Sequence, residues 1–231
     1  FSFSQVDQNH VGSLTKSQFD DDSARKTNNI AFSYRKVDAF RLSTSYEKEV
    51  GNSLISITPY LRDNSMDIIP SWMVSYDPVQ YTTKNQSFGF LSKYRQDFEP
   101  MRARLIVGLD FDISPGSRDE DSIRVTSTGN NITGRTYNYN KGVAPVKIYD
   151  YDVTFRSISP YVHGEFSPLE KLRVIAGLRY DDMQYDYDNN FRGGVAGASQ
   201  GVAGGFPGGG FYGHVASTKV DYSHWGPKLG A

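Results

Sequence analysis

Residues 172–188 read as one long strand in which apolar and polar side chains alternate. Alternation with a period of two predicts a strand whose two faces lie in different surroundings. The stretch exceeds the roughly 5–6 residues of a typical strand in a globular protein. Its apolar positions are Leu172, Val174, Ala176 and Leu178, and its cationic positions are Arg173 and Arg179. A strand with one apolar face, one cationic face and a far end rich in Tyr and Asp is typical of a wall between lipid and water.

The same alternation recurs along the chain, most clearly in residues 102–113. A change of parity near residues 156–157 predicts a β-bulge in the strand that contains them. Helical periodicity is poor, because Gly, Pro, Asn, Asp, Ser and Thr interrupt every candidate helix. The other expected strands cover residues 1–5, 38–48, 53–62, 84–97, 150–167 and 220–231. The side chains that we expect to face lipid include Leu105, Val107, Leu109, Val174 and Leu178.

Short and long connections alternate between these strands. The short ones are residues 49–52, 98–101 and 168–171, and the long ones are residues 6–37, 63–83, 114–147 and 189–217. In an up-and-down sheet this order places all short turns on one rim and all long loops on the other, as in outer-membrane barrels. The sequence therefore predicts an all-β fold, an antiparallel up-and-down transmembrane β-barrel segment of about eight strands.

Composition narrows the class of protein further. The chain has 231 residues, a formal net charge of −1 and no cysteine, so a general nucleic-acid binder, internal disulfides and thiolate metal sites are disfavoured. No run approaches the roughly 18 apolar residues of a membrane helix. The histidines show no metal-ligand spacing and no catalytic constellation is visible, so we expect neither a cofactor, nor a metal bound by side chains, nor enzymatic activity.

Several motifs resemble those of one family. The unit from Ile158 to Asp181, which ends in Gly177-Leu-Arg-Tyr-Asp181, resembles a recurring hairpin of TonB-dependent outer-membrane receptors. Trp225-Gly-Pro-Lys-Leu-Gly230 resembles the opening of the strand that follows it in the family. The stretch from Gly12 to Asp20 resembles a loop motif of siderophore-type receptors, and Ile106 to Asp112 resembles an upstream barrel strand.

The resemblance implies a barrel of about 22 strands with a plug inside it. It also implies energy-coupled uptake of a scarce chelate, most of all a ferric siderophore, across the outer membrane of a Gram-negative bacterium. The implied partners are outer-membrane lipid, the plug domain, TonB and the chelate. On this interpretation residues 1–231 are the central part of the barrel domain, without the plug domain and the C-terminal strands.

Candidate site residues fall into two sets. Arginines on the polar parity are expected to face the lumen: Arg41, Arg62, Arg102, Arg104, Arg173 and Arg179. Aromatic residues in the long loops are candidates for stacking on a ligand: Trp72, Tyr76, Tyr81, Tyr137 and Tyr139. Each has a plainer interpretation, since a wet barrel interior tolerates charge and loop aromatics also pack structurally.

Three further features are interpreted structurally. The strand-end residues Tyr149, Tyr151, Tyr180, Tyr185 and Tyr187 are expected in the interface girdle or at the rim. The acidic runs 20–22 and 119–121 lack the spacing of an EF-hand loop and are expected to be solvated. The glycine-rich stretch 193–213 lacks a following Lys-Ser or Lys-Thr and is expected to be an external loop.

Two other functions stay open on the sequence alone. Eight strands can close into a small barrel, which would make the chain a passive porin or a structural barrel. A secreted β-sandwich that binds a ligand through exposed tyrosines is the third possibility.

Overall fold

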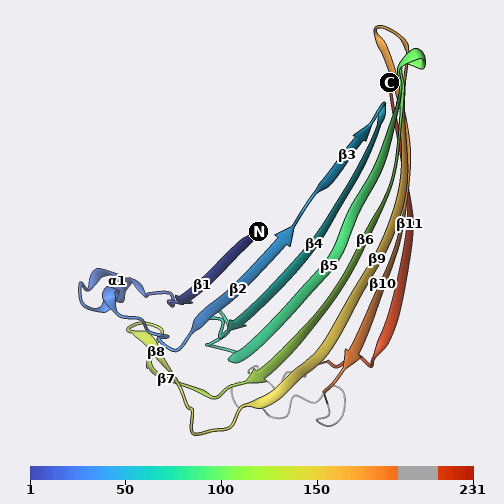
Figure 1. Ribbon diagram of the computed structural model, residues 1–231. Helices are drawn as coiled ribbons and strands as arrows, with labels where there is room; N and C mark the ends of the chain where they lie inside the picture. Colours follow the sequence, from blue (N-terminus) through green and yellow to red (C-terminus); the bar gives the residue numbers. More distant parts are fainter. Residues whose placement is uncertain (192–212) are drawn as a thin grey trace.

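The computed structural model describes residues 1–191 and 213–231, which form one curved antiparallel sheet of nine strands with few helical turns (Figure 1). The spatial order is β1-β2-β4-β5-β6-β9-β10-β11, with β3 paired to β4. The strands of this sheet are β1 (Ser2–Asn9), β2 (Tyr34–Ser43), β3 (Tyr46–Val50), β4 (Ser53–Ile68), β5 (Val79–Phe98), β6 (Ala103–Ser122), β9 (Val146–Leu169), β10 (Leu172–Asn189) and β11 (Thr218–Gly230). The prediction of an all-β, up-and-down antiparallel segment is confirmed, and a two-layer sandwich is not what these residues form.

Sequential strands pair with each other except at two places: β2 and β3 both pair with β4, and a hairpin lies between β6 and β9. Strands β7 (Val125–Asn130) and β8 (Gly134–Tyr139) pair only with each other, so β6 pairs with β9 across them. The helical elements are α1 (Lys16–Asp20), η1 (Ala24–Lys26) and η2 (Glu99–Met101). No helix in the described ranges is long and apolar enough to cross a membrane. The predicted glycine-rich loop lies largely outside the described residues.

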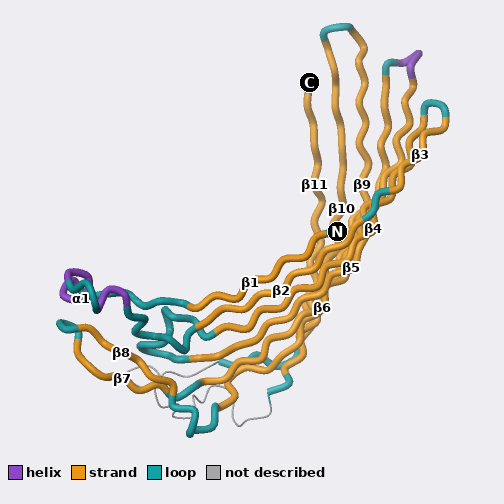
Figure 2. Tube along the Cα trace, turned by 60° about the vertical axis from the view of Figure 1, so that its left-hand side comes forward, coloured by secondary structure: helices purple, strands orange, loops and turns teal. Residues whose placement is uncertain are grey.

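The two ends of the sheet differ, as the alternation of connection lengths predicts. The tight turns β3–β4, β5–β6 and β9–β10 gather at one end, and the long connections with α1 and the β7–β8 hairpin gather at the other (Figure 2). Gly51 with φ +58° and Arg102 with φ 48° occupy the left-handed backbone region in two of the tight turns. Arg102 therefore belongs to a turn rather than to a lumen-facing strand position, which corrects its expected placement.

One face of the sheet is apolar and open. Cross-strand partners share a face, so the register brings the apolar parities of all the long strands together. Leu105, Val107, Val174 and Leu178 on this face are 37–40% exposed. The sheet is a single layer in this region and buries none of them in a core, as a lipid-facing wall requires. We call this face the outer face and the opposite one, which carries Arg62 and Arg179, the inner face.

The strands continue beyond the expected boundaries at the loop end. The sequence placed the end of one strand at residue 113, whereas β6 runs on to Ser122 and pairs with β5 and β9 throughout. The expectation followed apolar alternation, which ends at Ile113, but hydrogen-bonded pairing in water does not require apolar side chains. For the same reason Tyr81, expected in a loop, lies within β5.

The bulge expected near residues 156–157 is absent. Pairing of β9 with β10 and β6 is in register through this region, and the shifts occur between Leu172 and Val174 and between Glu120 and Asp121. The change of parity has another cause: Val153 and Phe155 are apolar side chains on the inner face.

A small hydrophobic core ties the long connections together at the loop end. Ile30, Ile69, Val74 and Ile123 are buried and come from three different connections. Tyr137 and Tyr139 of β8 are among the partly buried side chains that pack against them. The loop end is therefore a packed cap rather than a set of separate loops.

Candidate functional site

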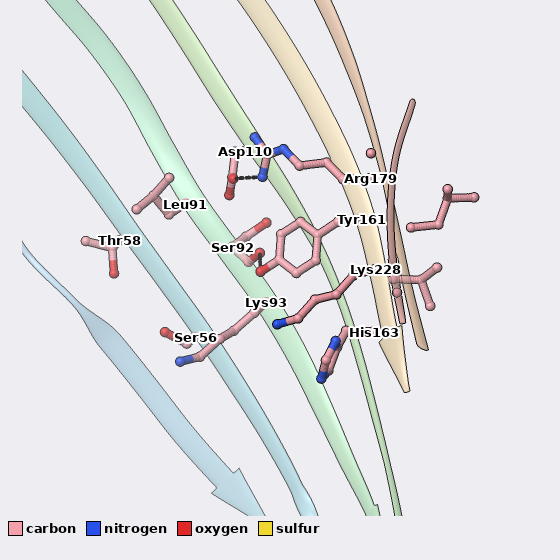
Figure 3. Close-up of a pocket in the computed structure, with 14 residues that line it drawn as sticks. Ser56, Thr58, Leu91, Ser92, Lys93, Asp110, Tyr161, His163, Arg179 and Lys228 are labelled. Atoms are coloured by element: carbon pink, nitrogen blue, oxygen red, sulfur yellow. Dashed lines mark hydrogen bonds and ion pairs between the residues drawn. The ribbon is translucent and has the colours of Figure 1, made fainter. Parts of the chain in front are cut away.

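The inner face is hollowed between β4 and β11. The hollow has a volume of about 550 Å³ and is lined by residues from six strands (Figure 3). Small residues make the space, since Gly177 and Gly226 lie opposite His163 and Arg179 in the neighbouring strands. Side chains that line it include Ser56, Thr58, Leu91, Lys93, Asp110, Tyr161, His163, Arg179 and Lys228.

Arg179 is the best-anchored cation of the hollow. Its Nη1 lies 2.6 Å from Oδ2 of Asp110, and its Nε lies 2.7 Å from Oδ1 of Asp181. Asp110 is on β6, so this pair joins strands separated by β9. Lys93 and Lys228 add two further positive charges on the wall of the hollow (Figure 3). Lys93 lies 4.0 Å from the Glu47 carboxylate on β3, so Lys228 is the cation of the hollow that has no ion pair among the described residues.

A second ionic cluster lies on the inner face at the short-turn end. Arg104 donates through Nε to Oδ1 of Asp97 at 2.5 Å, and Arg95 lies 3.2 Å from the same carboxylate. Glu165 forms an ion pair with Arg173 and lies 3.1 Å from Nε2 of His163. Arg104 and Arg173, both expected to face the lumen, thus have carboxylate partners.

Arg41 and Arg62 differ from these arginines. They are cross-strand partners on the inner face of β2 and β4, and both are exposed. Neither forms an ion pair with any residue that the structure describes. The guanidinium of Arg62 lies over the ring of Tyr60, 4.9 Å from its centroid. Two neighbouring guanidinium groups without carboxylates make a local excess of positive charge.

Two tyrosines lie flat on the inner wall over glycines of the next strand. A Cβ added to Gly108 would lie 2.2 Å from Cζ of Tyr161, and one added to Gly89 would lie 2.5 Å from Cζ of Tyr60. Lying flat, Tyr60 reaches across β5 and donates a hydrogen bond to the Asp112 carboxylate on β6. Each tyrosine side chain therefore spans three strands and lies along the sheet, so that it projects little into the lumen.

The loop aromatics differ in their exposure and in their neighbours. Trp72 is 60% exposed and lies 6.0 Å from the ring of His10, whereas Tyr76 is 40% exposed. Tyr137 and Tyr139 pack against the loop-end core, and the ring of Tyr139 lies 5.9 Å from that of Phe32. Tyr81 lies on β5 with the guanidinium of Arg118 4.0 Å from its ring centroid. The plainer interpretation therefore describes Tyr81, Tyr137 and Tyr139, and Trp72 is the aromatic best placed for contact with a ligand.

The tyrosines expected in a girdle divide between the two faces. Tyr180 lies on the outer face and its ring is 4.7 Å from that of Trp225, which suits an interface girdle. Tyr149, Tyr151, Tyr185 and Tyr187 lie on the inner face, so a lipid-facing girdle is wrong for these four, whereas packing at the rim stays a prediction. A signal was present in the sequence, because Tyr185 and Tyr187 share the parity of Arg179.

The acidic runs make local contacts. Asp21 accepts hydrogen bonds from the backbone nitrogens of Ala24 at 2.8 Å and Ser23 at 2.7 Å, and these bonds lower the pKa of its carboxyl. In the other run, Nζ of Lys147 lies 2.5 Å from Asp119 and 3.0 Å from Asp121. These carboxylates are therefore occupied by backbone amides and lysine.

Glu120 is a buried acid on the inner face of β6, near the loop end and beyond Ile113, the last apolar outer position of that strand. It pairs with Arg118 at 2.5 Å and is 4% exposed. Burial raises the pKa of the Glu120 carboxyl, while Arg118 acts in the opposite direction. No group of His, Asp and Glu in the described ranges has an arrangement that could hold a metal ion.

Comparison with known proteins agrees with this geometry. The family model described as TonB dependent receptor-like, beta-barrel, matches residues 2–231. No curated protein matches the chain. The chain belongs to the TonB-dependent receptor β-barrel family, whose members are transporters of the outer membrane of Gram-negative bacteria and work with a plug domain and TonB.

Proposed function

We propose that this member of the family takes up a scarce chelate, a ferric siderophore, by energy-coupled transport through the outer membrane. The observation that supports this proposal most is the two-sidedness of a single curved sheet. Its outer face is apolar and exposed, and its inner face carries a hollow with charged walls. A wall of this kind separates lipid from an aqueous path.

Outer-membrane lipid is the proposed partner of the outer face. The apolar outer positions of β6 run from Ala103 to Ile113. At about 3.4 Å per residue and a tilt of about 45°, this stretch rises roughly 24 Å. That height fits the apolar band of about 25 Å in outer-membrane barrels.

The plug domain is the proposed partner of the hollow. Lys93, Lys228 and Arg179 line the wall, and Asp110 and Asp181 neutralise Arg179. An acidic segment of the plug would find complementary charge at Lys228, since Lys93 lies 4.0 Å from the Glu47 carboxylate. Movement of that segment on energy input from TonB would then open the path.

The loop end is the proposed entrance. Trp72 is exposed on the cap and offers a flat apolar surface for a chelate. The cap core of Ile30, Ile69, Val74 and Ile123 holds the surrounding connections in place. The cap would thus present a preformed surface to an arriving ligand.

Uptake of radiolabelled iron tests the proposal. Cells whose only iron receptor is the full-length protein should accumulate iron from a ferric siderophore, and should stop when TonB is deleted or the proton gradient is collapsed. Uptake that persists without TonB would instead indicate a passive porin. A structural barrel would support no uptake in either strain.

A further inference from the structure

One cross-strand row of the inner face contains arginine side chains at one end and aromatic side chains at the other. The cross-strand register and one hydroxyl contact define the row. From β2 to β10 it reads Arg41, Arg62, Ser87, Ser114, Phe155 and Tyr185. We call this the Arg–Ser–aryl row.

The cationic end of the row is free to bind an anion. Arg41 and Arg62 are neighbours with no ion pair among the described residues, unlike Arg104, Arg173 and Arg179. Because Arg41 and Arg62 are cross-strand partners, one anion between β2 and β4 could pair with both side chains. Guanidinium groups also bind planar anionic oxygens with two parallel hydrogen bonds.

The other end of the row opens into an aromatic panel on β9, β10 and β11. Phe155 and Tyr185 have ring centroids 4.9 Å apart, and Tyr185 and Tyr222 are 6.1 Å apart. Tyr151 and Tyr187 form a further pair at 5.2 Å, nearer the loop end. Tyr185 is 42% exposed and Tyr222 is 54% exposed, so ring surface remains open toward the lumen.

The rings of the panel carry no charge, and Arg118, the β6 neighbour of Tyr151, is paired with Glu120. Ser157, Val153 and Met183 are its other inner-face neighbours on β9 and β10. The nearest acid toward β4 is Asp112, and it already accepts hydrogen bonds from Tyr60 and Ser114. A ligand on the panel is therefore held by ring contacts and not by salt bridges.

The serines set the distance between the two ends. Ser87 and Ser114 are small, and their hydroxyl oxygens lie 2.8 Å apart on the wall. From Arg62 to Phe155 there are three inter-strand steps of about 4.8 Å, or roughly 14 Å along the sheet. A ligand of about this width would touch guanidinium at one side and aromatic rings at the other.

We propose that the Arg–Ser–aryl row selects an anionic chelate that carries aryl rings, of the tricatecholate class, over hydroxamate and carboxylate chelates. Its oxyanions pair with Arg41 and Arg62, and one aryl group stacks on Phe155 and Tyr185. A trihydroxamate complex has no aryl group for the panel and less charge for the arginines. This inference rests on the proposed uptake of a ferric chelate.

Binding to the purified full-length receptor tests the row, with a ferric tricatecholate, a ferric trihydroxamate and ferric citrate as probes in titration calorimetry. Tyr185→Ala should lower affinity for the tricatecholate about tenfold, from the loss of an aromatic contact. Arg62→Gln should lower it about tenfold or more, from the loss of a charged hydrogen bond. Tyr185→Phe keeps the ring and should retain most of the affinity.

Matched controls lie on the outer face of the same strands. Tyr180→Ala removes a ring from β10, and Arg156→Gln removes a guanidinium from β9, without touching the row. Both should bind the tricatecholate as the parent does. A difference in gel mobility between unheated and heated samples, as the parent shows, indicates that each variant has folded as a barrel.

Either of two binding results would overturn the inference. One is tighter binding of the trihydroxamate or citrate complex than of the tricatecholate. The other is equal loss of affinity in Tyr185→Ala and Tyr180→Ala. TonB-dependent uptake of a hydroxamate chelate that is unchanged in Tyr185→Ala would refute the role of the row and leave the proposed function standing. Absence of uptake of all three chelates would refute the proposed function.

Discussion

A charge placed on the outer face should destabilise the barrel far more than the same charge on the inner face. Val107 lies on the outer face of β6, 39% exposed, and Leu91 lies on the inner face of β5, 49% exposed. Both are aliphatic residues of adjacent strands, so they make a matched pair. Val107 stands four residues from Ala103 in a stretch that ends at Ile113, which places it about 10 Å inside the apolar band.

The expected cost of Val107→Arg follows from that depth. An arginine on the lipid face near the midplane costs about 2–4 kcal/mol, and the cost falls toward zero near the interfaces. Leu91→Arg places the guanidinium in the hollow, at the position opposite Asp110, and should change stability by less than about 0.5 kcal/mol. The two variants of the full receptor, folded into lipid vesicles, would be compared by urea titration monitored by gel mobility.

Equal costs for the two variants would refute the assignment of lipid to the outer face. A larger cost for Leu91→Arg would reverse it. A measured difference of about 2 kcal/mol or more, with Val107→Arg the less stable, is the expected outcome.

Other substitutions test separate parts of the fold. Gly108→Ala forces a Cβ to within 2.2 Å of Tyr161 and 2.5 Å of the Ser92 carbonyl oxygen, so it should lower the free energy of unfolding by about 1–3 kcal/mol in a urea titration. Gly226→Ala is the control and should be neutral, because the nearest atom to its added Cβ is 4.0 Å away. Similar costs for the two variants would contradict the close approach of Tyr161 to Gly108. Deleting residues 125–139 removes the β7–β8 hairpin and uncovers Ile30, Ile69 and Ile123, so trypsin should cut the loop end faster while the barrel still migrates as folded. Because hydrogen bonds lower the pKa of Asp21, its carboxylate stabilises the local turn above its unfolded pKa near 3.8, and this stabilisation is lost as the pH falls through the lower, folded pKa. Amide exchange of residues 23–27 should therefore become faster in acid. In Asp21→Ala the exchange of these residues should be fast at every pH.

Much of the architecture could be predicted because it depends on local patterns. Alternating polarity fixes which parity of a strand meets lipid, and connection lengths fix which rim holds the turns. The ends of the strands could not be found in this way. From Ser114 to Ser122 the strand β6 has polar side chains on its outer face and is held by pairing with its neighbours, which a single sequence does not show.

The site was less accessible to sequence reasoning because it depends on register. Arg179 meets Asp110 across β9, and only the register of three strands brings them together. Tyr60 over Gly89 is a contact of the same kind. By contrast, the parity of Tyr185 and Tyr187, which they share with Arg179, predicts that both side chains face inward. The expectation that they belong to an interface girdle did not take this parity into account.

The arginines expected to face the lumen show why placement alone does not assign function. Arg104, Arg173 and Arg179 lie on the inner face with carboxylates at bonding distance, so their charge is already balanced within the wall. For these three, the plainer interpretation of a wet interior that tolerates charge accounts for what the structure shows. Arg41 and Arg62 lie on the same face without carboxylate partners among the described residues, and the guanidinium of Arg62 lies over the ring of Tyr60 instead. What matters for binding is therefore whether an arginine already has a carboxylate partner within the wall. This separates Arg41 and Arg62 from Arg104, Arg173 and Arg179, although the sequence pattern groups all five together.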